Sequence, residues 1–133
     1  MNTIELQKLD LVEAWSKADP TERVRFTYAI NGETGQQQCS VAYAELEAGG
    51  AIPRHSDSAT EVILVAEGTV EIESDGQVGT YGPGTLLAIP PHAKHRTENS
   101  GDSTARLVLY FDSPANEVTF DDPLMPMDAS SLS

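Results

Sequence analysis

Residues 23–30 (RVRFTYAI) alternate between apolar and polar side chains. In an extended chain Val24, Phe26, Tyr28 and Ile30 fall on one side, because successive side chains point to opposite faces. The Asn31-Gly32 pair that follows is a common turn sequence. The pattern therefore predicts a half-buried strand that ends in a turn.

Similar short segments continue along the chain. The segment 61–66 (EVILVA) is apolar and rich in β-branched residues, which favours a central strand, and 105–111 (ARLVLYF) alternates again. Together the pattern predicts strands at roughly 37–47, 61–66, 69–74, 78–81, 85–90 and 105–111. Turn residues separate them, including Gly49-Gly50, Glu67-Gly68 and Asp75-Gly76. Many short strands with even spacing favour an all-β barrel or sandwich.

The two ends of the chain have a different character. Asp10 is placed to cap a short helix that carries Leu11, Val12 and Trp15, and Pro20 would limit it. From Asp121 onward the sequence is acidic and contains proline, which is typical of a mobile tail or of a segment that packs on a partner subunit. We therefore expect a peripheral segment at 1–22, a barrel at 23–115 and an acidic tail at 116–133.

Charge and composition exclude several classes of function. The 133 residues include 21 acidic and 8 basic ones, for a net charge of -13. Such a field repels nucleic acid and anionic membranes. Cys39 is the only cysteine, so no disulfide forms within the chain, and no stretch resembles a secretory signal or approaches the length of a membrane span. We expect a soluble cytoplasmic protein of one domain.

Candidate metal ligands lie in two stretches. His55, Asp57 and Glu61 occupy odd positions and would share one face of an extended segment, and His95 follows some way along the chain. Two imidazoles and one or two carboxylates, brought together by strand pairing, form a site for a divalent transition metal.

These two stretches resemble the two motifs of the cupin superfamily. The first motif has Gly, His-x-His, Glu and Gly, and Gly49, His55, Glu61 and Gly68 match its intervals, with Asp57 where the second His is usual. The second motif has Gly, Pro-x-Gly, His and Asn. Here the matching residues are Gly84, Pro90, His95 and Asn99, and His92 stands in place of the middle Gly. Eight of the ten motif positions therefore agree.

The resemblance implies a small antiparallel double-stranded β-helix, or jelly-roll barrel, that holds one divalent metal ion per chain. His55, Glu61 and His95 match ligand positions of the family. Asp57 is open to three interpretations: a fourth ligand, a group that orients an imidazole or a bound water, or a residue without contact to the metal. The carboxylates favour Fe(II) or Mn(II), with Ni(II) or Zn(II) as further candidates. A metal-free cupin, in which these groups contact a ligand directly, is the alternative.

Other polar residues also have two interpretations. His92 is either a solvent-facing turn residue or a proton shuttle at the barrel mouth. If the face with Leu107 is the core, Arg106 is solvated. If the other face lines the cavity, Arg106 and Tyr110 are placed to hold a substrate carboxylate. Tyr43 is a further, weaker pocket candidate.

The implied function is that of a metal-dependent enzyme acting on a small organic molecule. O2-dependent oxidation of the dioxygenase type is the first expectation. A lyase, isomerase or cyclase reaction, with Glu61 or Asp57 as base, is the second, and a non-catalytic binding cupin is the third. By analogy with short single-domain cupins we expect a homodimer, with the strand at 23–30 and the tail after Asp121 at its interface.

Overall fold

The computed structural model describes residues 1–35 and 38–133. Its strands are β1 (Val12–Ser16), β2 (Arg23–Ile30), β3 (Ser40–Leu46), β4 (Ala51–Asp57), β5 (Glu61–Glu67), β6 (Val70–Ser74), β7 (Gln77–Tyr81), β8 (Leu86–Ile89), β9 (His95–Asn99), β10 (Ala105–Phe111), β11 (Val118–Met125) and β12 (Ala129–Leu132). The helical elements among these residues are two 3₁₀ turns, Leu6–Lys8 and Gly32–Thr34. The described residues contain no helix of the length and hydrophobicity that a membrane span requires.

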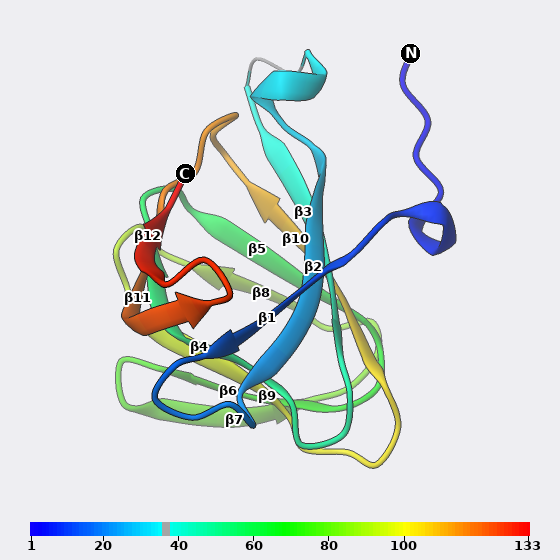
Figure 1. The fold of residues 1–133 in the computed structure, drawn as a ribbon. Helices are drawn as coiled ribbons and strands as arrows, with labels where there is room; N and C mark the ends of the chain where they lie inside the picture. The colour runs from blue at the N-terminus through cyan, green and yellow to red at the C-terminus, as the bar shows by residue number, and fades with distance from the viewer. Residues whose placement is uncertain (36–37) are drawn as a thin grey trace.

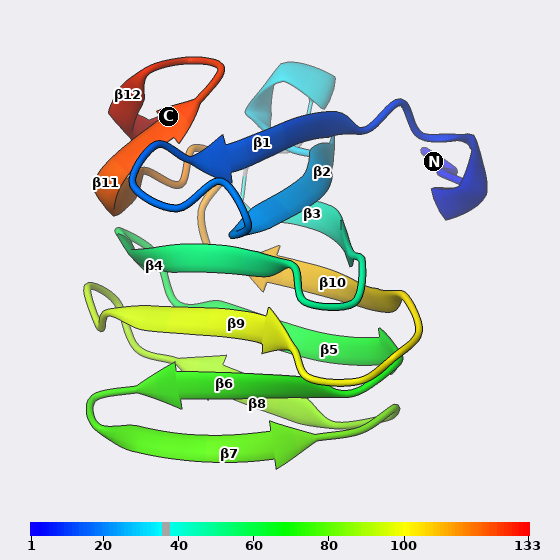
Figure 2. The same ribbon diagram turned by 60° about the horizontal axis from the view of Figure 1, so that its bottom comes forward.

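The strands form one antiparallel sheet that curls on itself. Its order is β7-β6-β9-β4-β11-β1-β2-β3-β10-β5-β8, and β12 pairs with β11 beside this path. Figure 2 shows the strands β7, β6, β9 and β4 as one layer, with β8, β5 and β10 behind them. Figure 1 shows β1 and β2 where the sheet passes from one layer to the other. The predicted all-β barrel is therefore confirmed.

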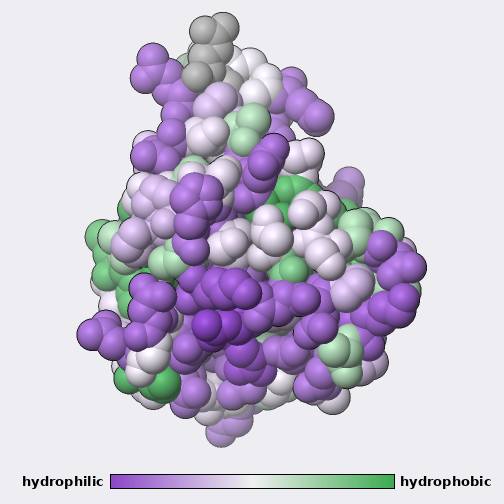
Figure 3. Space-filling model, turned by 90° about the vertical axis from the view of Figure 1, so that its left-hand side faces the viewer, coloured by the Kyte–Doolittle hydropathy of each residue, from purple (hydrophilic) through white to green (hydrophobic). Residues whose placement is uncertain are grey.

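Strand alternation places the core between the two layers. In β4 every second residue is buried, from Ala51 to Asp57, and β10 buries Leu107, Leu109 and Phe111 in the same way. The outer face of β4 and its neighbours is polar instead. It carries ion pairs such as Arg54 with Glu73, Lys94 with Asp121 at 2.7 Å and Arg96 with Glu22 at 2.6 Å. Figure 3 shows hydrophilic side chains gathered over this side of the molecule.

The prediction of a helix after Asp10 is wrong. Residues Val12–Ser16 form β1, which pairs with β2 on one side and β11 on the other. The side chains that β1 buries are Ala14 and Ser16, which are too small or polar to reveal a strand in the sequence. Trp15 lies on the outside, where the Arg23 guanidinium stacks 4.4 Å from the centre of its ring.

The acidic segment from Asp121 is also part of the sheet. It supplies the second half of β11 and all of β12, and β11 pairs with β4 through Val118, Thr119 and Phe120. The expected homodimer stays a prediction. In the single chain, β2 is hydrogen-bonded on both edges, to β1 and to β3.

The strands of the structure differ from the predicted ones in two details. A register shift between Tyr28 and Ile30 ends the alternation in β2, so that Ala29 is buried and Ile30 pairs with Val41. The strand predicted from position 37 begins at Ser40 in the structure, and positions 36–37 lie outside the described residues.

Candidate metal centre

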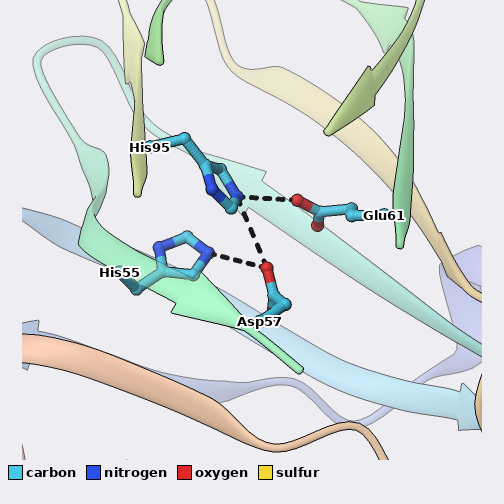
Figure 4. Close-up of side chains that lie close together, drawn as sticks. All are labelled: His55, Asp57, Glu61 and His95. Atoms are coloured by element: carbon cyan, nitrogen blue, oxygen red, sulfur yellow. Dashed lines mark hydrogen bonds and ion pairs between the residues drawn. The ribbon is translucent and has the colours of Figure 1, made fainter. Parts of the chain in front are cut away.

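Four side chains meet inside the barrel: His55, Asp57, Glu61 and His95 (Figure 4). His55 and Asp57 lie on β4, Glu61 begins β5, and His95 begins β9. The antiparallel register sets His55 opposite His95, with 4.2 Å between the ring centres. One ligand atom from each of the four residues lies within 4.8 Å of the others, and all four residues are buried. The strand pairing therefore assembles the cluster that the sequence predicted.

Backbone carbonyls fix both imidazoles in the same tautomer. The Nδ1 of His55 lies 2.7 Å from the carbonyl oxygen of Pro53, and the Nδ1 of His95 lies 2.9 Å from that of Ala93. A carbonyl oxygen only accepts, so each Nδ1 carries a proton and donates it. When neutral, each ring then has its lone pair on Nε2, which faces the carboxylates of the cluster. When protonated, Nε2 donates to those carboxylates instead. Metal-binding histidines are typically held in this way.

The two carboxylates complete the cluster. Glu61 Oε1 lies 2.8 Å from the Nε2 of His95. Asp57 Oδ2 lies 3.5 Å from the Nε2 of both histidines, and it is buried with no hydrogen-bond partner. A buried carboxylate oxygen without a donor is costly unless a cation satisfies it. A metal ion held between this oxygen and the two Nε2 atoms would satisfy it.

The charges in this cluster shift two pKa values. Burial alone would raise the pKa of Asp57, but the nearby imidazole of His55, the amide of Asn116 and the charge of His95 outweigh this effect, so this pKa is lowered. Burial alone would lower the pKa of His95. The hydrogen bond and charge of Glu61 outweigh that effect, so this pKa is raised. Both carboxylates therefore favour a positive charge in the cluster.

These residues fit a divalent metal ion. Two neutral imidazoles and two carboxylates carry a net charge of about -2, which a divalent cation balances. Each of the four side chains offers one ligand atom, and these atoms lie close enough together to surround one ion. The arrangement supports Asp57 as a fourth ligand among the three interpretations that the sequence left open. Whether it binds the metal directly remains a prediction.

A cavity of about 320 Å³ opens beside the cluster. His55, Asp57 and Glu61 form part of its wall, and the ring of Phe120 packs 5.2 Å from the ring of His55. The remaining wall is mostly apolar and comes from both layers of the barrel, through β2, β3, β10 and β11. A small molecule in this cavity would therefore lie against the candidate ligands.

The structure places the other predicted site residues outside this cavity. His92 is exposed in the turn after the two prolines and adopts a positive φ of 65°, which explains why glycine is usual at this motif position. The burial of Leu107 settles the orientation of β10, so Arg106 and Tyr110 lie on the outer face. Arg106 bonds there with Glu45, with Glu67 at 3.0 Å and with the Tyr43 hydroxyl at 2.9 Å.

Two residues at the site were not predicted from the sequence. Asn116 is buried and donates from Nδ2 to Asp57 Oδ1 at 2.8 Å, while its Oδ1 accepts from the backbone N–H of Ala59 at 3.1 Å. Tyr28 lines the cavity near Asn116, and burial raises the pKa of its hydroxyl, which therefore stays protonated at neutral pH. No local pattern marks Asn116, because it reaches Asp57 across 59 positions.

The remaining motif residues shape the backbone around the site. Gly68 has a φ of 81°, and a Cβ there would lie 2.8 Å from the Cα of Ala105. The side chain of Asn99 donates to the carbonyl oxygens of Leu46 and Ser103 and accepts from the N–H of Gly101. These residues hold the loops at the ends of the strands that carry the ligands.

Comparison with known proteins identifies the family. The cupin domain profile matches residues 42–111, more than half of the chain. This protein belongs to the cupin family. No curated protein matches its sequence.

Solved structures share the fold at low sequence identity. The polyketide cyclase RemF from Streptomyces resistomycificus superposes with a TM-score of 0.70 at 20% identity, over 87% of this chain and 83% of that one. A predicted oxalate decarboxylase from Thermotoga maritima gives 0.72 at 12% identity, over 84% and 99%. A putative sugar phosphate isomerase from Acidithiobacillus ferrooxidans gives 0.68 at 17% identity, over 89% and 80%. At these identities the likeness shows the cupin fold alone.

Proposed function

We propose that this cupin is a metal-dependent enzyme that oxidises a small organic molecule with O2. One observation carries the proposal: four buried side chains place their ligand atoms within 4.8 Å of one another, and three of these side chains line a cavity. Two His with carboxylates is a ligand set that suits Fe(II) oxygen chemistry, and Mn(II) is favoured by the same hard oxygen ligands. Ni(II) and Zn(II) remain candidates for the same site.

The residues of the site would have different roles according to where they lie. When bound, a divalent metal supplies Lewis-acid and, for Fe(II) or Mn(II), one-electron chemistry. His55, Asp57, Glu61 and His95 would hold it, and the backbone carbonyls and Asn116 keep three of these side chains oriented. The apolar wall excludes water from the substrate. Glu61 also lines the cavity, so its carboxylate is placed to accept a proton from a bound substrate.

A non-redox reaction of the lyase, isomerase or cyclase type is the second candidate. It needs the same ligands and a carboxylate base, for which Glu61 is placed. Two structures with this fold, the polyketide cyclase and the putative sugar phosphate isomerase, are named for such chemistry. A third possibility, a cupin that binds a ligand without turnover, is an outcome of the experiment below.

The first experiment measures metal content by elemental analysis of untagged protein. We expect about one Fe or Mn per chain after reconstitution, because residues 1–35 and 38–133 contain one such ligand cluster. His95→Ala should lose most of this metal, since it removes one of two imidazole ligands. The matched control is His92→Gly, which removes an exposed imidazole and installs the residue usual at this motif position. Equal metal content in wild type and His95→Ala would refute the site.

Oxygen consumption then separates the reactions. The Fe(II)-loaded protein should consume O2 with some member of a panel of enolic, catecholic and thiol compounds. Failure across the panel, combined with proton exchange on carbonyl compounds, would favour the non-redox candidate. Ligand-induced thermal stabilisation without either activity would leave a binding protein.

A further inference from the structure

The wall of the cavity is mostly apolar outside the metal centre. Of the nineteen residues that line it, thirteen have apolar side chains. The largest of these are Phe26 on β2, Phe111 on β10 and Phe120 on β11. Both layers of the barrel thus present hydrocarbon surface to the same space. A bound molecule can gain contact with this surface only through apolar groups of its own.

Apart from Ser133, the polar groups of the wall gather near the candidate ligands. Asn116 is bonded to Asp57, and the Tyr28 hydroxyl interacts with Asn116 and with the charges of Asp57 and Glu61. Among the described residues that line the cavity, none is Lys or Arg. Arg54, Arg96 and Arg106 instead form ion pairs on the outer face. The cavity therefore offers one polar end and no cationic side chain.

This charge distribution disfavours strongly anionic or heavily hydroxylated substrates. A divalent cation balances the two carboxylates of the cluster, so little positive charge remains for a second anionic group. A phosphate or a dicarboxylate would lose its hydration without gaining a charged partner. A sugar would bury several hydroxyls against hydrocarbon without hydrogen bonds. A compound with one oxygen-bearing end has no such cost, because that end faces the metal centre.

The size of the cavity limits the substrate further. A dry apolar cavity of about 150 Å³ accepts one benzene ring in a protein core. The cavity of this cupin, at about 320 Å³, has roughly twice that volume. We propose that the substrate is a neutral or singly acidic phenol or enol about two fused rings in size, with its oxygen toward the metal centre. This inference rests on the proposed function, because the metal centre supplies the polar contact.

The β11–β12 hairpin supplies a wall that variants can change without touching the ligands. Leu132 on β12 and Met127 in the turn before it both line the cavity. Ser131, one residue earlier, is exposed and does not line it. β12 pairs only with β11 among the described strands, so substitutions in it affect few other contacts.

Isothermal titration calorimetry with 2-naphthol tests this inference, on protein loaded with redox-inert Zn(II) and on metal-depleted protein. We expect 2-naphthol to bind at one per chain, and oxalate and glucose 6-phosphate not to bind. Leu132→Lys places a charge in the apolar wall. It should weaken the binding of 2-naphthol by about tenfold or more, since an unpaired buried charge costs well over 1.4 kcal/mol. Ser131→Lys, with the same charge on the outer side, should bind as wild type does.

Each outcome bears on a different claim. If Leu132→Lys does not fold, Leu132→Asn makes a milder test with an uncharged polar group at the same place in the wall. Binding of oxalate or glucose 6-phosphate in preference to 2-naphthol would overturn the substrate class. If the protein holds one metal per chain but does not bind 2-naphthol, the substrate class would also be overturned. The proposed function would stand in that case. Binding of 2-naphthol by a protein that takes up no metal would support the substrate class and refute the proposed function.

Discussion

Replacing Asn116 by alanine should weaken metal binding without removing a ligand. The Nδ2 of Asn116 donates to Asp57 Oδ1 at 2.8 Å, which leaves Asp57 Oδ2 directed at the two imidazoles. A hydrogen bond to a charged group contributes about 1.5–3 kcal/mol, and groups that orient a ligand typically change metal affinity by about 10–100-fold. Since tenfold corresponds to about 1.4 kcal/mol, the two figures agree. Titration calorimetry with Mn(II) should show this loss at unchanged stoichiometry.

A double-mutant cycle separates orientation from a general loss of stability. Asn116→Ala also frees the buried N–H of Ala59, which should cost about 1–3 kcal/mol in the free energy of unfolding. If Asn116 acts through Asp57, its effect on affinity should disappear in an Asp57→Ala background, while the effect on unfolding persists. Ser58→Ala, which alters the same loop but not the Asp57 contact, is the control. An equal loss of affinity in both backgrounds would refute the reasoning.

Two further predictions concern pH and backbone. The raised pKa of His95 means that protons compete with the metal already above the ordinary value of 6.5, so Mn(II) affinity should fall by about tenfold per pH unit below that raised pKa. Affinity that is constant from pH 8 to pH 5 would contradict this. Gly68→Ala combines a φ of 81° with a clash against Ala105 and should lower the free energy of unfolding by about 2–5 kcal/mol. Gly76→Ala is the control, because φ there is 77° but an added Cβ would have no atom within 4 Å. Urea denaturation should show that it lowers the free energy of unfolding by only about 1–2 kcal/mol. Equal losses for the two variants would exclude the clash at Gly68.

The strands that could be predicted from the sequence are those that bury large apolar side chains. Residues 61–66 and 105–111 carry large apolar side chains on their buried faces, so β5 and β10 were predicted within a residue. β1 and β12 bury or half-bury alanine and serine instead, and pairing with β2 and β11 holds them in place. Tertiary context decides such strands, because their own residues favour no conformation strongly.

The candidate ligands were predictable because motif spacing reflects strand register. His55 and His95 meet because β4 and β9 pair in one register, which the intervals between motif residues encode. The orientation of Arg106 depended on which face of β10 is buried, and the sequence left both faces plausible. Asn116 lies beyond both motifs, and only the folded barrel brings it to Asp57.

The cupin motif usually has a histidine at the position of Asp57, and an aspartate there is consistent with the apolar wall of the cavity. Three histidines and one glutamate around a divalent ion would carry a net charge of about +1, whereas two histidines, Asp57 and Glu61 bring the total close to zero. In an apolar wall, a residual positive charge would attract an anionic group that no other side chain there could solvate. A neutral centre instead favours a neutral or weakly acidic oxygen. Asp57, as a metal ligand, and the hydrocarbon wall would therefore favour the same kind of molecule, which supports the proposed substrate class.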